Sequence, residues 1–438
     1  MKSPAKQRLP LGLLAWRVLS LVAEPFAPLL LSQRAARGKE DRARIKERLG
    51  VAGQARPDGR LVWLHGASVG ESLAALPLIE QLQTQMPGTF VLVTSGTVTS
   101  AAMMSHRLPA GAIHQFVPLD TPGAVARFLD HWKPDAGLFV ESDLWPNLIL
   151  AARARGVALA LVNARISARS AQGWNRARKS VAMLLSSFTM VLAQDEEIAA
   201  RFKKLGASKV DVVGSLKADA PPLGVEEEAL AALRQAIGKR PVLLAAQTHP
   251  GEDETVLPAH DLLRTDFPDL LTILVPRHTG RGADLEMLCG PRAHARRSTG
   301  KDITGQTAIY IADTMGELGL FYRLAPIVFM GGSLVEHGGQ NPIEAIKLGA
   351  SVVHGPHVFN FTDVYEALDS AGGARRADSQ EALMKQLGQL LDDPKARDAA
   401  LVASERVVEQ LGGALERTLA ALEPYLLQLR LEMGAANA

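Results

Sequence analysis

The stretch RLVWLHGASVGESLAALPLIEQLQTQMPGTFVLVT, residues 60–94, carries the pattern that decides the fold. Short apolar runs occupy Arg60–His65 and Phe90–Thr94, and residues with helical periodicity fill Glu71–Gln85 between them. Apolar runs of this length on both sides of a helix are typical of parallel strands that are buried on both faces. The stretch therefore predicts a strand–helix–strand unit and a protein of the α/β class.

The alternation of strand and helix patterns continues along the chain with one interruption. Around residues 218–227 a polar link that contains ADAPPLG replaces it, and the alternation resumes after this link. We therefore predict two doubly wound halves with a cleft, in which ligands bind beyond the carboxyl ends of the strands. The tail from about Glu381 is predicted to be helical. Further helices are predicted at Pro122–Trp132 and Asp195–Leu205, and further strands at Ile113–Val117, Ala136–Glu141, Val157–Asn163, Met190–Ala193, Lys209–Val213, Pro241–Ala246, Leu270–Val275, Ala308–Ile311, Pro326–Met330 and Ser351–His354.

Length and composition narrow the function classes. A chain of 438 residues is too long for one ordinary core, which agrees with two domains. A formal net charge of only +2 gives no general argument for nucleic-acid binding, so no nucleic acid is expected as a partner. The single cysteine, Cys289, cannot form an internal disulfide and is interpreted as a small buried apolar residue. The glycines form neither GxGxxG nor a P-loop, which argues against nicotinamide dehydrogenases and P-loop NTPases.

The N-terminal segment combines an apolar run with a basic stretch. The run Leu9–Leu31 is interrupted by Arg17 and Glu24, and a charge at mid-bilayer costs several kcal/mol, which argues against a spanning helix. Two readings stay open: a segment lying on an anionic membrane surface, which we favour, and a helix packed on its own domain. The basic residues that follow the run are Arg34, Arg37, Lys39, Arg42, Arg44, Lys46 and Arg48.

Three motifs in the first half follow predicted strands. In HGASVGE, residues 65–71, Ser68 and Glu71 have the spacing of a capping box, but Glu71 could equally serve as a general base. In FVESDLWPN, residues 139–147, the acids Glu141 and Asp143 stand before a helix start, either as site residues or as a favourable helix-terminal turn. In GSLKAD, residues 214–219, Lys217 is either an exposed linker residue or a cation facing an anionic substrate.

Glycine-rich turns recur in the second half. Thr314 and Glu317 again have capping-box spacing, and in HGGQNPIE, residues 337–344, Asn341 is predicted to cap a helix that begins at Pro342. Helix N-termini of this kind expose N–H groups to a phosphate, Arg277 could add charge, and Glu344 could accept from ribose hydroxyls. We therefore expect a nucleotide-binding half. His249 and His278 lack metal-ligand spacing and are predicted to be structural.

The motifs of this chain, taken together, resemble those of a known family. The strings HGASVGE, VTSGTVTS, FVESDLWPNL, NARIS, GSLKAD, THPGEDE, VPRH, ADTMGELGLFYRLAPIVFMGGSL, HGGQNPIEA and GPHVFNF are similar, in this order, to the bacterial Kdo transferases. These are the 3-deoxy-D-manno-octulosonic acid (Kdo) transferases of lipid A assembly, glycosyltransferase family 30. The resemblance covers roughly residues 35 to 370.

The resemblance implies a fold and a reaction. It implies a GT-B fold with three segments: a membrane-associating segment at 1–35, an acceptor-binding Rossmann-like domain at 36–219 and a donor-binding one at 220–438. It also implies inverting transfer of Kdo from CMP-Kdo to a lipid A precursor such as lipid IVA, in lipopolysaccharide biosynthesis. No metal and no cofactor are expected, and the setting is the cytoplasmic face of a Gram-negative inner membrane.

The resemblance also assigns roles to residues of this chain. Glu71 corresponds to the catalytic base, and Glu141 and Lys217 correspond to a transition-state-stabilising pair. Three departures from the family pattern are Ala67, where a bulkier residue is usual, Asp143 and Gln340, where a Glu and a His are common. The residues that match the CMP-binding segments are Pro276, Arg277, Met315, Gly316, Glu317, Asn341, Pro342, Ile343 and Glu344.

Two rival functions remain at this stage. One keeps the GT-B fold but changes the chemistry to that of a UDP-sugar transferase or epimerase. The other is a membrane-bound binding protein without catalysis, against which the full set of Glu71, Arg277, Asn341 and Glu344 argues.

Overall fold

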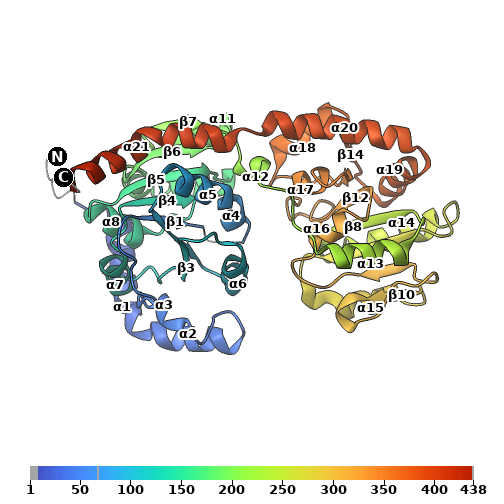
Figure 1. Cartoon of the computed structure of the whole chain (residues 1–438), viewed down its shortest axis with the longest axis horizontal. Helices are drawn as coiled ribbons and strands as arrows, with labels where there is room; N and C mark the ends of the chain where they lie inside the picture. Colours follow the sequence, from blue (N-terminus) through green and yellow to red (C-terminus); the bar gives the residue numbers. More distant parts are fainter. Residues whose placement is uncertain (1–7, 67–68, 437–438) are drawn as a thin grey trace. The chain divides into compact units, whose positions relative to one another are not determined.

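The computed structural model describes residues 8–66 and 69–436, and the chain forms two compact units (Figure 1). The first unit runs to Ala220 and also takes in the residues from Gly412 onward. The second unit is Pro221–Leu411. The chain therefore passes between the units twice, once within the proline-containing link and once near its end.

The last helix departs from the domain assignment made from the sequence, which gave all of residues 220–438 to the second domain. Residues from Gly412 onward belong to the first unit. The reason is packing, because Leu419, Leu422 and Leu426 of this helix complete an apolar core on one face of the first sheet. An amphipathic pattern indicates that a helix is buried on one side but not which unit it covers.

The first unit is built on a parallel sheet of seven strands in the order β3-β2-β1-β4-β5-β6-β7. Its seven predicted strands all form, with ends shifted by one or two residues. The strands are β1 (Leu61–His65), β2 (Phe90–Ser95), β3 (Ala112–Phe116), β4 (Ala136–Val140), β5 (Ala158–Ala164), β6 (Phe188–Ala193) and β7 (Val210–Val212).

Both faces of this sheet are buried, which explains the unbroken apolar runs. In β1, Leu61 and Trp63 belong to one apolar cluster, and Val62 and Leu64 belong to the other. Successive side chains of a strand point to opposite faces, so a strand covered on both sides needs apolar residues throughout. The helices of this unit are α1 (Leu11–Ala23), α2 (Ala27–Ala36), α3 (Ile45–Arg48), α4 (Val69–Ala74), α5 (Leu76–Gln85), α6 (Val98–Arg107), α7 (Pro122–Trp132), α8 (Pro146–Ala154), α9 (Ala168–Asn175), α10 (Arg178–Leu185), α11 (Glu196–Leu205), α12 (Leu216–Asp219) and α21 (Ala414–Ala436), with the 3₁₀ turn η1 (Glu24–Phe26) between α1 and α2.

One helix predicted from the sequence is divided into two helices in the structure. The helical pattern over Glu71–Gln85 predicted a single element, whereas α4 ends at Ala74 and α5 begins at Leu76. Pro77 lies in the first turn of α5. Proline has no N–H to donate to the preceding turn and is tolerated best in the first turn of a helix, and the break falls directly before this turn.

The second unit repeats the architecture with a parallel sheet in the order β10-β11-β9-β8-β12-β13-β14. The two edge strands were not predicted, because each has three residues and includes exposed or half-exposed basic side chains. The strands are β8 (Val242–Thr248), β9 (Leu271–Pro276), β10 (His294–Arg296), β11 (Ile309–Ile311), β12 (Ile327–Met330), β13 (Ser351–His354) and β14 (Ala374–Arg376). The helices are α13 (Glu227–Ile237), α14 (Asp253–Leu263), α15 (Gly282–Cys289), α16 (Leu318–Tyr322), α17 (Pro342–Ile346), α18 (Thr362–Ser370), α19 (Gln380–Asp392) and α20 (Pro394–Leu411), with 3₁₀ turns η2 (Thr279–Arg281) and η3 (Arg297–Thr299).

The N-terminal helical segment packs on the first unit along one side. Trp16 Nε1 donates to Asp120 Oδ2 at 2.7 Å, and the backbone N–H of Gly123 donates to Glu24 Oε2 at 2.9 Å. Leu11–Ala36 is long and apolar enough to cross a membrane by length and composition, with a mean hydropathy of 1.5 in the relevant window. The contacts with Asp120 and Gly123 hold the segment against α7 and the turn before it.

The other side of this segment is apolar and exposed, so packing on the first unit accounts for only one side of it, and contact with a membrane stays a prediction. The exposed side chains are Leu11, Leu14, Val18, Leu19, Leu21, Val22, Phe26, Leu29 and Leu30.

The basic stretch after the segment is partly neutralised. Arg34 and Arg48 form ion pairs with the buried Glu40, and Arg44 pairs with the buried Glu47. The cations left exposed to solvent are Arg37, Lys39, Arg42 and Lys46.

Candidate functional site

The site in the first unit lies where the strand order of the sheet reverses. Strands β1 and β4 are neighbours, and the chain winds outward from them in opposite directions. Loops at the carboxyl ends of two such strands form a crevice, which is where ligands bind in doubly wound sheets. Glu71 follows β1, and Glu141 follows β4 directly. The topology therefore places two of the three predicted catalytic residues beside this crevice.

Glu71 is half-buried in the first turn of α4. The end of β1 and the start of this helix approach closely, because a Cβ at Gly66 would lie 3.4 Å from the Glu71 Cβ. Ser72 Oγ donates to the Gly66 carbonyl at 3.4 Å, which ties the helix start to the strand end. Ser68, the other half of the predicted capping box, and Ala67, one of the departures from the family pattern, lie outside the described residues.

Glu141 and Lys217 form an ion pair. Lys217 Nζ lies 2.8 Å from Glu141 Oε1, and the two side chains are only 19% and 18% exposed. Lys217 belongs to α12, which packs against the helix that carries Glu71. The structure thus excludes the exposed-linker reading of Lys217 and brings all three predicted catalytic residues to one end of the sheet.

The backbone around this pair is unusual. Glu141 has φ +63° and Asn163 has φ +50°, values that few residues other than glycine adopt. Asn163 lies where the register between β5 and β6 shifts, and its Oδ1 accepts from the backbone N–H of Leu216 at 3.0 Å. Asn163 therefore anchors the start of α12 and with it Lys217. Strain and strand irregularities of this kind are concentrated at functional sites.

His65 is the buried histidine at the end of β1. Its Nδ1 lies 3.0 Å from Thr94 Oγ1, and its Nε2 lies 3.8 Å from Asp143 Oδ2. Burial lowers the pKa of His65 to about 4, so the ring is neutral at pH 7. Burial also raises the pKa of Asp143. The Asp143 carboxyl therefore faces an uncharged imidazole and lies in a partly desolvated position, unlike a simple surface turn.

The corresponding crevice of the second unit lies between β8 and β12, where its strand order reverses. Glu252, which immediately precedes α14, is fully buried there. Its two carboxylate oxygens accept four backbone N–H bonds of 2.6–2.9 Å, from His249, Gly332, Ser333 and Leu334. One carboxylate thus ties the loop after β8 to the loop after β12, and we refer to it as the Glu252 clamp.

Three histidines meet at the same crevice. The rings of His249 and His337 are stacked with centroids 4.0 Å apart, and the rings of His249 and His278 are 6.1 Å apart. His249 follows β8, His278 follows β9 and His337 follows β12. His278 and His337 are exposed. Burial and the nearby cations lower the pKa of His249 to about 4. His249 and His278 were predicted from the sequence to be structural residues, and His337 was not predicted to belong to a site.

The residues predicted to bind CMP lie at or beyond the carboxyl ends of β9, β11 and β12 but differ in exposure. Arg277 and Met315 are exposed, whereas Pro276 and Ile343 are buried. Ile343 therefore packs in the core and can offer a ligand only its backbone. Gly316 has φ +86°, which a glycine adopts without strain.

Glu317 is held by an ion pair that the sequence did not reveal. Both of its carboxylate oxygens bond the guanidinium of Arg297, and Thr314 Oγ1 also donates to it. Arg297 lowers the pKa of Glu317. No capping box forms here, because α16 begins after Glu317 and Thr314 binds the Glu317 side chain instead of a backbone N–H.

Asn341 caps its helix as predicted. Its Oδ1 accepts from Ile343 N–H at 3.2 Å, Pro342 is the first helical residue, and Asn341 Nδ2 donates to Glu344 Oε1 at 3.3 Å. The helices α16 and α17 each have only five residues, however. The dipole of such a short helix is small, so an anion bound here depends more on cationic side chains than the sequence suggested.

The Glu252 clamp had a weak signal in the sequence. Thr248-His-Pro-Gly-Glu252 follows a predicted strand and places a glutamate three residues after a histidine, at capping distance. That spacing could have suggested a carboxylate that binds nearby backbone N–H groups. Nothing local could have shown that three of its four donors come from a loop about eighty residues away.

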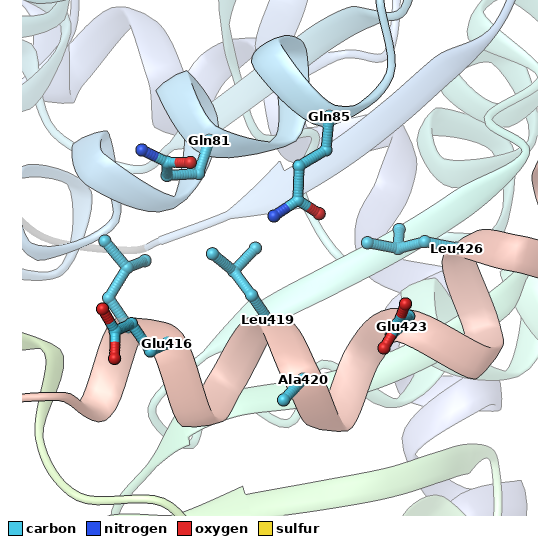
Figure 2. A pocket seen from close by; sticks show the side chains of 8 residues that line it. Gln81, Gln85, Glu416, Leu419, Ala420, Glu423 and Leu426 are labelled. Carbon is cyan, nitrogen blue, oxygen red and sulfur yellow. The ribbon is translucent and has the colours of Figure 1, made fainter.

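A groove of ≈ 590 Å³ lies elsewhere in the first unit, between α5 and α21 (Figure 2). Figure 2 shows Gln81 and Gln85 of α5 opposite Leu419 and Glu423 of α21. Its lining has carboxylates and amides but no basic side chain. The groove does not match an anionic substrate and contains none of the predicted site residues.

Two other features of the described residues bear on chemistry. No group of three or more His, Cys, Asp or Glu side chains among residues 8–66 and 69–436 has the arrangement of a metal site. Cys289 is fully buried as predicted, and burial raises the pKa of its thiol to about 11. It is therefore unsuited to act as a nucleophile.

Comparisons with known proteins agree with the family resemblance of the sequence motifs. The family model described as 3-deoxy-D-manno-octulosonic-acid transferase (kdotransferase) matches residues 43–220. A 3-deoxy-D-manno-octulosonic acid transferase from Haemophilus influenzae is 34% identical over 93% of this chain and 97% of its own length. Another from Bordetella pertussis is 38% identical over 83% of this chain and 87% of its own length.

Solved structures of low identity show the fold. A UDP-GlcNAc 2-epimerase from Neisseria meningitidis has a TM-score of 0.57 and 14% identity over 84% of this chain and 100% of its own. A glycosyltransferase from Rickettsia africae has a TM-score of 0.56 and 12% identity over 84% of this chain and 99% of its own. Together with the two parallel seven-stranded sheets, they confirm the predicted α/β fold of GT-B type.

Proposed function

This chain belongs to the 3-deoxy-D-manno-octulosonic acid transferase family, and from that premise we propose that it transfers Kdo from CMP-Kdo to a lipid A precursor such as lipid IVA. The transfer inverts the anomeric configuration, takes place at the cytoplasmic face of the inner membrane and contributes to lipopolysaccharide biosynthesis. The observation that carries the proposal is the group formed by Glu71 and the ion-paired Glu141 and Lys217 at the crevice of the first unit.

The proposed reaction is a single displacement. The acceptor hydroxyl oxygen forms a bond to the anomeric carbon of Kdo while the bond from that carbon to the phosphate oxygen breaks. The departing cytidylate keeps the electron pair, and Glu71 takes the proton of the hydroxyl. Attack opposite the leaving group inverts the anomeric carbon. Negative charge grows on the phosphate, so cationic side chains lower the barrier most when they are fixed in advance.

The ion pair supports the role of Lys217 as such a fixed cation. Glu141 holds the ammonium at 2.8 Å, and Asn163 anchors the start of the helix that carries it. We propose that Lys217 stabilises the charge that develops in the transition state and that Glu141 positions it. A fixed charge needs no reorganisation as the reaction proceeds, unlike a flexible surface lysine.

Replacing Lys217 by methionine is expected to lower kcat about 10²–10³-fold, the usual cost of removing one fixed transition-state donor. Glu141→Gln is expected to lower kcat less, because a neutral amide still accepts from the ammonium. Steady-state kinetics with CMP-Kdo and lipid IVA would measure both effects, and thermal unfolding would report any loss of stability.

Glu197→Gln is the matched control, because Glu197 forms an ion pair with Arg201 on the exposed face of α11. We expect this variant to keep wild-type kinetics. A Lys217→Met enzyme that turns over at the wild-type rate would contradict the role given to Lys217.

The exposed apolar side of the N-terminal segment supports an acceptor that resides in a membrane. Leu11, Leu19, Val22, Phe26 and Leu29 are each more than 60% exposed. Apolar side chains so exposed next to solvent-exposed cations are typical of helices that lie in the headgroup region of anionic bilayers. We propose that this face rests on the membrane while the opposite face stays packed on the first unit.

Changing Leu19, Val22 and Leu29 to serine is expected to release the protein from anionic lipid vesicles. Each fully buried side chain of this size contributes about 1.5–3 kcal/mol, so the partition coefficient should fall at least about a hundredfold. Co-sedimentation with vesicles measures this change, and unfolding midpoints should stay near the wild-type value.

Leu13→Ala provides the control for the opposite face, because Leu13 is only 3% exposed and belongs to the core. This variant should lose stability but retain vesicle binding. Unchanged vesicle binding by the triple serine variant would rule out this face as the membrane contact.

The nucleotide that is released distinguishes Kdo transfer from the rival UDP-sugar chemistry on the same fold. We expect CMP to be produced when the enzyme, CMP-Kdo and lipid IVA are combined, and no UDP from UDP-GlcNAc under the same conditions. Release of UDP without release of CMP would favour the rival UDP-sugar transferase, and conversion of UDP-GlcNAc to an epimeric UDP-sugar without release of either nucleotide would favour the rival epimerase.

A further inference from the structure

The histidine cluster of the second unit has no role in the function proposed so far. His249 and His337 stack at 4.0 Å across the crevice between β8 and β12, and His278 approaches His249 from β9. These are the loops beyond the carboxyl ends of three neighbouring strands, at the point where the strand order reverses. The position is the usual ligand position of a doubly wound sheet.

Charged side chains of both signs surround the cluster. The cations Arg277 and Arg281, and the other two histidines when they are protonated, all disfavour a proton on His249. The acids nearby are already engaged, because Glu252 accepts backbone N–H groups and Asp253 accepts from Thr248 and Arg281. The cluster therefore combines imidazole nitrogens with the exposed guanidinium of Arg277, and both kinds of group bind anions.

The cluster is held in place and remains accessible. The Glu252 clamp fixes the backbone of His249 and of the loop that leads to His337. His278 and His337 are exposed, and only His249 is buried. Gln340 Nε2 lies 3.4 Å from His249 Nε2, and an amide nitrogen only donates, so the neutral ring accepts at this atom.

We propose that His249, His278 and His337, together with Arg277, form the subsite that holds an acid group of the donor, and that donor binding is coupled to proton uptake by this cluster. The inference rests on the proposed function, because it takes CMP-Kdo as the donor. That molecule carries two anions, the phosphodiester and the sugar-acid carboxylate. The shared chemistry is recognition of a compact oxyanion by imidazole N–H groups and a guanidinium.

The direction of the pH dependence follows from the charges. An anion beside His249 favours its protonated form and therefore raises its pKa from about 4. A proton is then taken up on binding at pH values between the pKa of the free ring and that of the complex, and donor affinity should increase as the pH falls through this range. The donor phosphodiester and carboxylate do not change charge between pH 6 and pH 8, so a proton taken up in that range belongs to the protein.

The test is isothermal titration calorimetry of the full-length protein with cytidine, CMP and CMP-Kdo. His337→Ala and His278→Ala are exposed changes that should leave folding intact, and His249→Gln removes the titrating ring together with its stacking on His337. We expect about a ten- to hundredfold loss of affinity for the anionic ligand and no loss for cytidine. His294→Ala, on the edge strand β10, is the control and should bind all three ligands normally.

The three ligands identify the anion. A loss already seen with CMP assigns the cluster to the phosphate, and a loss seen only with CMP-Kdo assigns it to the carboxylate. Proton uptake, measured in buffers of different ionisation enthalpy, should occur with CMP-Kdo in the wild type and disappear in His249→Gln.

The inference would be overturned if the His337→Ala and His278→Ala proteins bound CMP and CMP-Kdo as tightly as the wild type. It would also be overturned if cytidine lost affinity equally. If either result is obtained and the wild-type protein transfers Kdo, only the inference about the histidines fails and the proposed function stands. A wild-type protein that neither binds CMP-Kdo nor transfers Kdo would instead contradict the proposed function.

Discussion

Glu71→Gln is expected to lower kcat for Kdo transfer by about 10²–10⁴-fold, the range lost when a positioned general base is removed. Glutamine keeps the shape of the side chain but cannot take the proton of the acceptor hydroxyl. Glu71 is in the first unit, and the residues predicted to bind CMP are in the second. We therefore expect CMP affinity to remain at the wild-type value. Single-turnover transfer and calorimetric CMP binding measure the two quantities separately.

The matched control for this variant is Glu80→Gln. Glu80 lies on the neighbouring helix α5 and is exposed, so its charge should not matter for turnover. If Glu71→Gln transferred Kdo at a rate close to that of Glu80→Gln, the assignment of Glu71 as base would fail. A loss of CMP binding in Glu71→Gln would show that the change disturbed more than proton transfer.

The second large effect is expected at the Glu252 clamp. Glu252→Ala leaves four buried backbone N–H groups without their acceptor, and each orphaned donor costs about 1–3 kcal/mol before relaxation. Water can enter and the loops can adjust, so we expect a net loss of about 3–5 kcal/mol in the stability of the second unit. CMP binding should weaken as well, because the loops after β8 and β12 lose their common anchor.

Glu254→Ala separates the clamp from the general effect of removing a carboxylate near the start of α14. Glu254 is exposed and accepts a single backbone N–H, that of Gly251, at 2.8 Å. Chemical denaturation should show a loss below about 1 kcal/mol for this control. An equally small loss for Glu252→Ala would mean that the clamp does not hold the two loops together.

Much of the fold could be predicted from the sequence because central parallel strands are buried on both faces. Runs such as Leu61–His65 and Leu271–Pro276 are apolar at almost every position, and this signal is independent of the partner strand. The edge strands β10 and β14 lack it, since an edge is only partly covered. The docking of α21 on the first unit depends on a contact between distant parts of the chain, which periodicity does not encode.

The site was predictable where a motif follows a strand directly. Glu71, Glu141 and Lys217 were found in this way, and the structure shows that Glu141 and Lys217 meet at 2.8 Å. Their catalytic roles remain predictions. Partners joined only by folding were missed, such as Arg297 for Glu317 and the His337 ring stacked on His249. Their sequence separations of twenty residues and more leave no local pattern.

The central claim is tested most directly by incubating the purified full-length protein with CMP-Kdo and lipid IVA and weighing the lipid product by mass spectrometry. We predict a lipid heavier by one or more Kdo residues, with one CMP released for each residue added. The Haemophilus influenzae relative is incubated with the same substrates in parallel. Lipid IVA that keeps its original mass with this protein, in a preparation where the relative converts it, would contradict the account.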